Sequence, residues 1–573
     1  MMYQHGINAC KTGRKVFILG LDGATFDIIK PLIDKGELPN IAHIMKSGAH
    51  AELNSTVLPH SPSAWTSFST GKNPGKHGII GFRKMMRNAY KLDLVTGQDN
   101  KVKTLWEILS EKEKKVIVMN IPMTYPPKPV NGILISGMDA PSTASNFTYP
   151  LEIREELLNA VPDYKIRVYL GGYLTNNQKR IKALDLLKST IHARTKAVLH
   201  LMKNHPWDLF VVRYNNPDNV QHQYWNFMDE THPSHDVNAP NILKDGIKSI
   251  YRELDKAVGI IYSNINKENT TFIIMSDHGG SKLIGSIHVN EWLRSMGYLY
   301  KTGEENRLNF DNLFRNMVSR IKGKTFSLLL KYVPLEVKLY VKRLFPFIDL
   351  KPYTHYRFAH IDWSRTKAFT GEVESIRINL EGKYPFGTVG EKEYLSLREE
   401  IVDAAKKLKD PVSGEYVFKN VFKKEEVFSP DWIKDFPDII LQPREYYTIS
   451  AEFKPRGNGS FIGKNEHWRR ISGGHAQYGI FIITGPDCKS GIKLNPLEIV
   501  DILPTVLYQF NLPIDSNVDG RVVKDVFKKE FVDLHPIRHE DVKEYDNHKI
   551  DEIYNEDEKS KIAAGLRELG YIE

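Results

Sequence analysis

The chain has 573 residues, 41% of them hydrophobic, and its 79 basic and 70 acidic residues leave a formal net charge of +9. That size and apolar content can bury a large core, and charges of both signs scattered in this way do not by themselves indicate nucleic-acid binding. The two cysteines, Cys10 and Cys488, exclude a disulfide framework and suit a reducing compartment. Residues 1–15 hold no apolar segment of signal-peptide length, and no run approaches the roughly 18 apolar residues of a spanning helix. We therefore expect a soluble cytoplasmic protein and leave open a peripheral contact with a membrane surface.

Apolar runs that are typical of buried strands alternate with helical patterns through the first 300 residues. We expect strands at residues 16–21, 116–120, 133–136, 209–214 and 272–276. We expect helices from about Thr25 onward, at residues 186–203 and at residues 242–264. This alternation predicts a largely parallel sheet with helices on both faces, and sites in such sheets form beyond the carboxyl ends of the strands.

Residues 301–362 depart from this pattern. Basic and apolar side chains are mixed there, as in Phe314, Arg315 and Lys322, and we predict a helical insertion that caps or borders the site. A helix pair packed on the main domain is favoured over a lid that faces a membrane. The sequence predicts a discontinuous catalytic domain at residues 15–300 and 363–527, with a helix at residues 391–408, and a peripheral segment at residues 528–573.

Six potential metal ligands stand beside the predicted strands or on a helix. Asp22 follows the first strand, and Asp277 and His278 follow the strand that ends at residue 276. Three more potential ligands are Asp218, His222 and His475. Asp218 and His222 are four residues apart, so they can share one side of a helix. Three carboxylates and three imidazoles are the set that two adjacent divalent ions need.

Each of these residues also has an ordinary structural explanation. The pair Asp218 and His222 occurs often by chance, and Asp277 alone would as readily cap a helix or turn. His475 alone would more often be a structural histidine, and it gains weight from Gly473 and Gly474 before it.

Ser61 is the candidate nucleophile, and it precedes Pro62 where a helix is expected to begin. A serine there could simply cap the helix, but a hydroxyl at a helix N-terminus also sits where a phosphate oxyanion is favoured. A metal ion beside it would lower the pKa of the hydroxyl. Ser63, Thr66 and Ser67 are rivals on the same turns.

Several segments together resemble the alkaline phosphatase superfamily, in its type I phosphodiesterase/nucleotide pyrophosphatase-like branch. The matching segments are residues 19–27, 61–79, 218–222, 276–279 and 519–521, with His475, and residues 120–127 resemble the predicted phosphohydrolase/phosphomutase subgroup. The resemblance covers most of residues 15–527. It implies an alkaline-phosphatase-like three-layer α/β fold with a mostly parallel central sheet and a helical insertion.

The resemblance also implies a role for each site residue. Asp218, His222 and His475 would hold one divalent ion, and Asp22, Asp277 and His278 would hold a second ion that also binds Ser61. The serine would attack phosphorus and form a covalent phosphoserine. Three imidazoles favour zinc, and manganese tolerates the same ligands.

The chain departs from the nucleotide pyrophosphatases at two points. Those relatives usually have threonine where Ser61 stands, and they have an asparagine that donates to the phosphoryl oxygen near the position of Phe82. Arg83, Lys72 or a residue of the insertion could replace this donor.

A metal-dependent phosphoesterase acting on an anionic phosphodiester or phosphomonoester is therefore the first hypothesis. A phosphomutase with the same phosphoserine and an inactive, metal-stabilised binding module are the alternatives. A sulfatase is disfavoured because neither Cys10 nor Cys488 lies near the site. We expect no specific nucleic-acid binding, and the basic insertion suggests a lipid-linked or polysaccharide-linked substrate.

Overall fold

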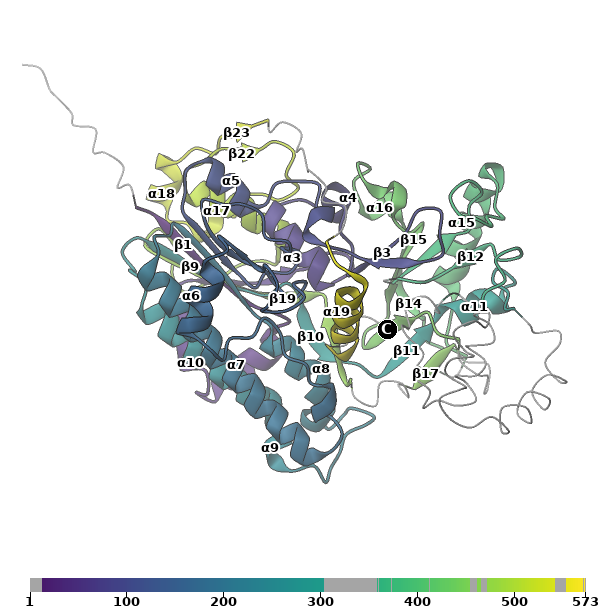
Figure 1. Cartoon of the computed structure of the whole chain (residues 1–573), viewed down its shortest axis with the longest axis horizontal. Helices are drawn as coiled ribbons and strands as arrows, with labels where there is room; N and C mark the ends of the chain where they lie inside the picture. Colours follow the sequence, from purple (N-terminus) through teal and green to yellow (C-terminus); the bar gives the residue numbers. More distant parts are fainter. Residues whose placement is uncertain are drawn as a thin grey trace, which may run out of the picture.

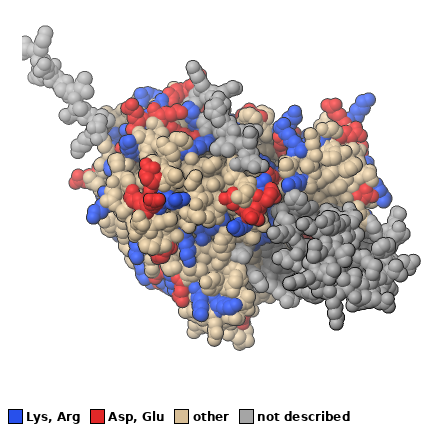
Figure 2. Space-filling model, viewed as in Figure 1, with Lys and Arg blue, Asp and Glu red and all other residues tan. Residues whose placement is uncertain are grey.

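A computed structural model describes residues 13–302, 358, 360–372, 374–411, 413–453, 461–464, 471–541, 553–569 and 571. The predicted insertion at residues 301–362 lies almost wholly outside this described part. Among the described residues, none of the helices combines the length and the apolar character that crossing a membrane requires. Lysine and arginine are interspersed with aspartate and glutamate over the face shown in Figure 2.

A ten-stranded sheet forms the centre of the larger part of the molecule (Figure 1). Its strands follow the order β20 (Ile492–Lys493), β2 (Ala49–Asn54), β19 (Tyr478–Thr484), β9 (Thr270–Met275), β1 (Lys15–Leu21), β8 (Leu209–Tyr214), β5 (Val116–Met119), β6 (Gly132–Ile135) and β7 (Thr148–Tyr149), and β21 (Leu497–Glu498) also pairs with β2. The strands from β9 to β6 run parallel, whereas β19 is antiparallel to both of its neighbours. The mostly parallel sheet that the sequence predicted is confirmed.

Side chains alternate along the strands, so both faces of this sheet carry apolar residues. Helices cover both faces. Phe17, Leu19 and Leu21 of β1 point into one core, and Val16 and Ile18 point into another. The first core contains side chains of α1 (Phe26–Asp34), α2 (Pro39–Ser47), α6 (Ile153–Ala160), α7 (Asn177–Asn204), α8 (Asn216–Met228), α9 (Asn241–Lys244) and α10 (Gly246–Ser263). The second contains side chains of α3 (Ser61–Thr70), α5 (Leu105–Glu111), α17 (Ile502–Gln509) and α18 (Lys529–Leu534). The three-layer α/β architecture is thus confirmed.

A smaller lobe lies beside the sheet and has a hydrophobic core of its own (Figure 1). It contains an antiparallel sheet of β12 (Ala368–Phe369), β13 (Ser375–Ile378), β15 (Ile439–Pro443) and β14 (Phe418–Lys423), with α11 (Val289–Ser295) and α15 (Glu391–Lys407). A three-stranded sheet of β16 (Tyr447–Ser450), β11 (Gly285–His288) and β17 (Ile462–Lys464) belongs to the same lobe. Within residues 363–527, the chain therefore builds this lobe first and then returns to the main sheet at β19.

Candidate active site

The predicted ligands meet at the carboxyl edge of three neighbouring strands. Asp22 follows β1, Asp277 and His278 follow β9, and Asp218 with His222 lies on α8 directly after β8. His475 lies on β18 (Gly473–Ala476), which pairs antiparallel with β10 (Gly279–Lys282). The rule that parallel sheets build sites at their carboxyl ends accounts for this convergence.

Asp218, His222 and His475 form one tight group. Nε2 of His222 lies 3.2 Å from Nε2 of His475 and 3.2 Å from Oδ1 of Asp218, and Nε2 of His475 lies 3.6 Å from the same oxygen. A tetrahedral zinc ion with bonds of about 2.0–2.1 Å holds its ligand atoms about 3.4 Å apart. The spacing of these three atoms therefore fits one ion.

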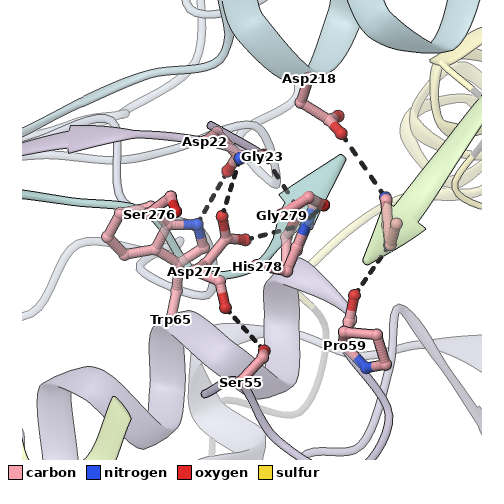
Figure 3. A network of polar contacts seen from close by, with 12 residues as sticks. Asp22, Gly23, Ser55, Pro59, Trp65, Asp218, Ser276, Asp277, His278 and Gly279 are labelled. Carbon is pink, nitrogen blue, oxygen red and sulfur yellow. Dashed lines mark hydrogen bonds and ion pairs between the residues drawn. The ribbon is translucent and has the colours of Figure 1, made fainter. Parts of the chain in front are cut away.

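A second group consists of Asp22, Asp277 and His278, whose ligand atoms lie within 4.8 Å of one another (Figure 3). Nε2 of His278 is 3.3 Å from Oδ2 of Asp277 and 4.0 Å from Oδ1 of Asp22. His278 also lies within 4.8 Å of Asp218 and His475, and its ring stacks on His475 at a centroid distance of 3.8 Å. The two groups are thus adjacent, with His278 between them.

All three imidazoles are oriented by the backbone. Nδ1–H of His222 donates to the carbonyl of Gly473 at 2.8 Å, and Nδ1–H of His475 donates to the carbonyl of Pro59 at 2.8 Å. Nδ1–H of His278 donates to the carbonyl of Gly279 at 2.9 Å. When it is neutral, each ring therefore presents an Nε2 lone pair to the centre, as metal-binding histidines do. Lone pairs of His222 and His475 that face each other require a proton or a cation between them.

The carboxylates also point unpaired oxygens at the centre. Oδ2 of Asp22 accepts from Nε1 of Trp65 at 2.8 Å and from Nε of Arg213, and Oδ1 of Asp277 accepts from the backbone N–H of Gly23 at 3.2 Å. Oδ1 of Asp22 and Oδ2 of Asp277 are buried, and among the described residues neither has a hydrogen-bond partner. Burial, and then the neighbouring Asp22 carboxylate, raise the pKa of Asp277. A divalent cation would relieve both the missing contacts and the repulsion, so these residues fit a metal centre.

The hydroxyl of Ser61 faces the same centre. Helix α3 begins at Ser61, with His60 as the capping residue and no side-chain cap, so the serine hydroxyl is not used to cap the helix. Its oxygen is fully buried and lies 3.3 Å from Nε2 of His278. Two of its rivals are engaged elsewhere: Thr66 donates to the carbonyl of Pro62, and Ser67 pairs with His77.

A cavity of about 860 Å³ leads away from this centre between the main sheet and the smaller lobe. His222, His475, Phe82 and Arg83 are among the residues that line it. Arg83 is therefore placed where a substrate anion could meet it. Lys72 is not among the lining residues, because its ammonium forms an ion pair of 2.6 Å with Asp515. The prediction that Lys72 contacts substrate thus needs correction.

Three further residues at the centre were not predicted. Arg213 and Trp65 both hold Asp22, and the hydroxyl of Tyr571 donates to Oδ2 of Asp218. Arg213 could have been suspected, because a charged residue in the buried strand β8 needs a buried partner. Tyr571 has no such local signal, and its contact corrects the prediction that residues 528–573 are peripheral.

Comparisons with known proteins give one family match and several structural matches. A family model described as type I phosphodiesterase/nucleotide pyrophosphatase matches residues 16–473. Solved structures of ectonucleotide pyrophosphatase/phosphodiesterase 5 from mouse and human are 13% identical, cover 90% of this chain and 100% of their own, and give TM-scores of 0.47 and 0.49. An inactive murine variant in complex with AMP gives 0.47. No curated protein sequence matches significantly, and these TM-scores are too low to add to the family match.

Proposed function

Because the chain belongs to the type I phosphodiesterase/nucleotide pyrophosphatase family, we propose that it is a phosphoester hydrolase that uses two divalent ions and Ser61 as its nucleophile. Membership of the family supports a phosphoester hydrolase. The two ions, the phosphoserine and the choice of Ser61 are the parts of the proposal that rest on the geometry of the site.

One observation carries the proposal. Six side chains from distant parts of the chain direct Nε2 lone pairs and carboxylate oxygens at one small volume, and the Ser61 hydroxyl borders it. Each of the three imidazole rings is held by a hydrogen bond from its Nδ1–H to a backbone carbonyl. The orientation of the rings therefore does not depend on a bound ion.

Asp218, His222 and His475 would hold one ion, and Asp22, Asp277 and His278 would hold the other. Bound ions would lower the pKa of the serine hydroxyl, activate water and offset the charge on the phosphoryl oxygens. Zinc suits the three imidazoles best, and manganese is the second choice.

The chain's own groups then perform the substitution. Oγ of Ser61 attacks phosphorus and gives up its proton to water, the bond to the ester oxygen breaks, and the leaving alkoxide takes a proton from water. In the second step, water attacks the phosphoserine, releases the phosphoryl product and restores the serine hydroxyl. Arg83 lines the cavity and is placed to bind a phosphoryl oxygen or the rest of an anionic substrate.

The substrate is a phosphate ester that enters through the cavity beside His222 and His475. A solved structure of an inactive murine ectonucleotide pyrophosphatase/phosphodiesterase 5 contains AMP, so nucleotide diesters belong among the first compounds to assay.

The test is hydrolysis by protein that has been stripped of metal and then loaded with Zn²⁺ or Mn²⁺. Substrates are bis(p-nitrophenyl) phosphate, p-nitrophenyl phosphate and a nucleotide diester, with free phosphate measured separately. We expect Ser61→Ala to remove turnover while the protein still binds metal. Ser63→Ala is the matched control, because it removes a buried hydroxyl from the same turn and should leave turnover intact.

Three results would contradict parts of the proposal. Turnover that persists in Ser61→Ala would exclude this nucleophile. Turnover without free phosphate, with a phosphoryl group moved within the substrate, would indicate a phosphomutase. Metal binding without turnover of any ester would favour a binding module.

A further inference from the structure

We propose that Tyr571 is a positioning residue of the metal centre, which holds Asp218 so that a single carboxylate oxygen is presented to the ion. This inference rests on the proposed function, because it assumes that Asp218 binds a metal. It assigns a role to a side chain that lies 353 positions away from Asp218 in the sequence.

The two oxygens of Asp218 have different surroundings. Oδ2 accepts the hydrogen bond from the Tyr571 hydroxyl, and within the described part of the chain no other side chain donates to it. Oδ1 faces Nε2 of His222 at 3.2 Å and Nε2 of His475 at 3.6 Å. Tyr571 therefore occupies one oxygen and leaves the other oriented toward the two imidazoles.

The ring of Tyr571 packs against two of the predicted ligands and against Phe82. It packs edge-on against the ring of His222, with centroids 5.8 Å apart, and lies 6.2 Å from the ring of His475. It also contacts Phe82 at a centroid distance of 5.1 Å. Phe82 stands near the position where the related enzymes have an asparagine. The apolar ring at this position thus has a structural use, because it packs against the tyrosine.

Helix α19 (Glu556–Leu569), labelled in Figure 1, leads the chain to Tyr571. Ile562 and Leu566 of this helix are buried in the main core. The backbone N–H of Tyr571 donates to the carbonyl of Leu566 at 2.9 Å, which ties the residue to the end of the helix. The placement of Tyr571 therefore follows from the docking of a whole helix and not from a single contact.

The segment at residues 120–127 provides part of the docking surface. Tyr125 of this segment stacks on Tyr554, which precedes α19, with centroids 5.6 Å apart and an angle of 7° between the rings. The hydroxyl of Tyr554 donates to the carbonyl of Asp139 at 2.8 Å, and Asp139 in turn accepts from the backbone N–H of Tyr125. This segment, which the phosphoesterase chemistry does not use, thus anchors the chain that leads to Tyr571.

A hydrogen bond to a ligating carboxylate fixes the direction of its metal-binding lone pair, and removing such a partner typically weakens metal binding about 10- to 100-fold. Without the Tyr571 hydroxyl, the carboxylate of Asp218 could rotate about its terminal bond, and Oδ2 would lose its donor. The ring packing would remain.

The test is the Tyr571→Phe variant of the full chain. Metal-free protein is titrated with Zn²⁺ in the presence of a competing chromogenic chelator, and the two dissociation constants are compared with those of the wild type. We expect the ion that Asp218 binds to be held 10- to 100-fold more weakly, with the other ion little affected. Tyr224→Phe is the matched control, because it removes a buried hydroxyl from α8, the helix that carries Asp218. That hydroxyl donates at 2.7 Å to the carbonyl of Arg180 and not to a predicted ligand.

Amide hydrogen exchange over residues 556–569 distinguishes positioning from a general loss of structure. Weaker metal binding with unchanged protection of α19 supports the proposal. Weaker binding with faster exchange throughout α19 would show that the hydroxyl only docks the helix, and would overturn it. Binding of Zn²⁺ that is unchanged or tighter in Tyr571→Phe would overturn it as well. Failure of the wild type to bind Zn²⁺ would instead contradict the proposed function.

Discussion

The hydroxyl oxygen of Ser61 lies 3.3 Å from Nε2 of His278, the imidazole that stands between the two groups of predicted metal ligands. That separation is close to the spacing of two ligand atoms on one tetrahedral ion. An ion bound by both His278 and Ser61 would lower the pKa of the serine hydroxyl, so the nucleophile would need no separate general base.

A phosphoserine should therefore be trapped at Ser61. We expect rapid acid quenching of the metal-loaded enzyme during turnover of p-nitrophenyl phosphate to leave one phosphoryl group on the peptide that contains Ser61, detected by mass spectrometry. Acid stops the attack of water and preserves the ester. A phosphoryl group found on Ser63, or on no peptide in an enzyme that turns over, would contradict the assignment.

Two adjacent glycines in β18 should respond differently to alanine. A Cβ on Gly473 would meet the carbonyl oxygen of Gln221 at 2.2 Å, so Gly473→Ala must displace β18 from α8. The carbonyl of Gly473 orients His222, so we expect about 10- to 100-fold weaker binding of Zn²⁺. A Cβ on Gly474 would meet nothing closer than Leu283 at 3.5 Å, and Gly474→Ala should bind Zn²⁺ as the wild type does. Equal effects of the two substitutions in a chelator titration would refute this explanation.

Arg213 should stabilise the metal-free protein through Asp22. Both side chains are buried, with exposures of 2% and 0%, and removing one partner of a buried ion pair costs about 3–5 kcal/mol. We expect Arg213→Met to lower the thermal midpoint in chelator more than the double variant Asp22→Asn/Arg213→Met does, since the double variant does not leave the Asp22 charge without its partner. The comparison is made by thermal denaturation, and a double variant that is less stable than Arg213→Met would count against the pairing.

His77 should make the fold sensitive to acid. Burial lowers its pKa to about 3, and its Nδ1 accepts from the backbone N–H of Ile79 at 3.2 Å. An unfolded histidine titrates near 6.5, so the unfolded chain binds the extra proton between about pH 6.5 and pH 3, and stability falls as the pH falls through that range. From about pH 7.5 to about pH 5, this group should cost about 2 kcal/mol.

Denaturant unfolding of metal-free wild type and His77→Gln at both pH values provides the measurement. The wild type should lose about 2 kcal/mol more than the variant on acidification. Equal losses would show that His77 is not held neutral by burial. The metal ligands titrate in both proteins, so their contribution cancels in the comparison.

The grouping of the predicted ligand residues could be anticipated from the sequence because their positions depend on local order. Asp22 and Asp277 come directly after apolar runs, and the end of a parallel strand determines the edge of the sheet where each side chain lies. His475 was found from its glycines and the strand that follows, although that strand, β19, proved to be antiparallel to its neighbours.

The remaining contacts depend on packing between distant segments. Lys72 pairs with Asp515 and Tyr571 reaches Asp218, and neither partner could be identified from the spacing or the composition of the chain. Strand β2 was also missed, because His50, Glu52 and Asn54 alternate with the apolar residues that it buries, so it lacks a continuous apolar run.

The order of strands in the sheet has a consequence for synthesis of the protein. Strand β2 pairs only with β19, β20 and β21 among the described strands, and all three lie beyond residue 477. On the ribosome, β2 must therefore wait without a partner until β19 has been translated, and β9, once it has been made, keeps one open edge until the same point. Open edges invite pairing with other chains, so we expect molecular chaperones to bind nascent forms of this protein until β19 has emerged.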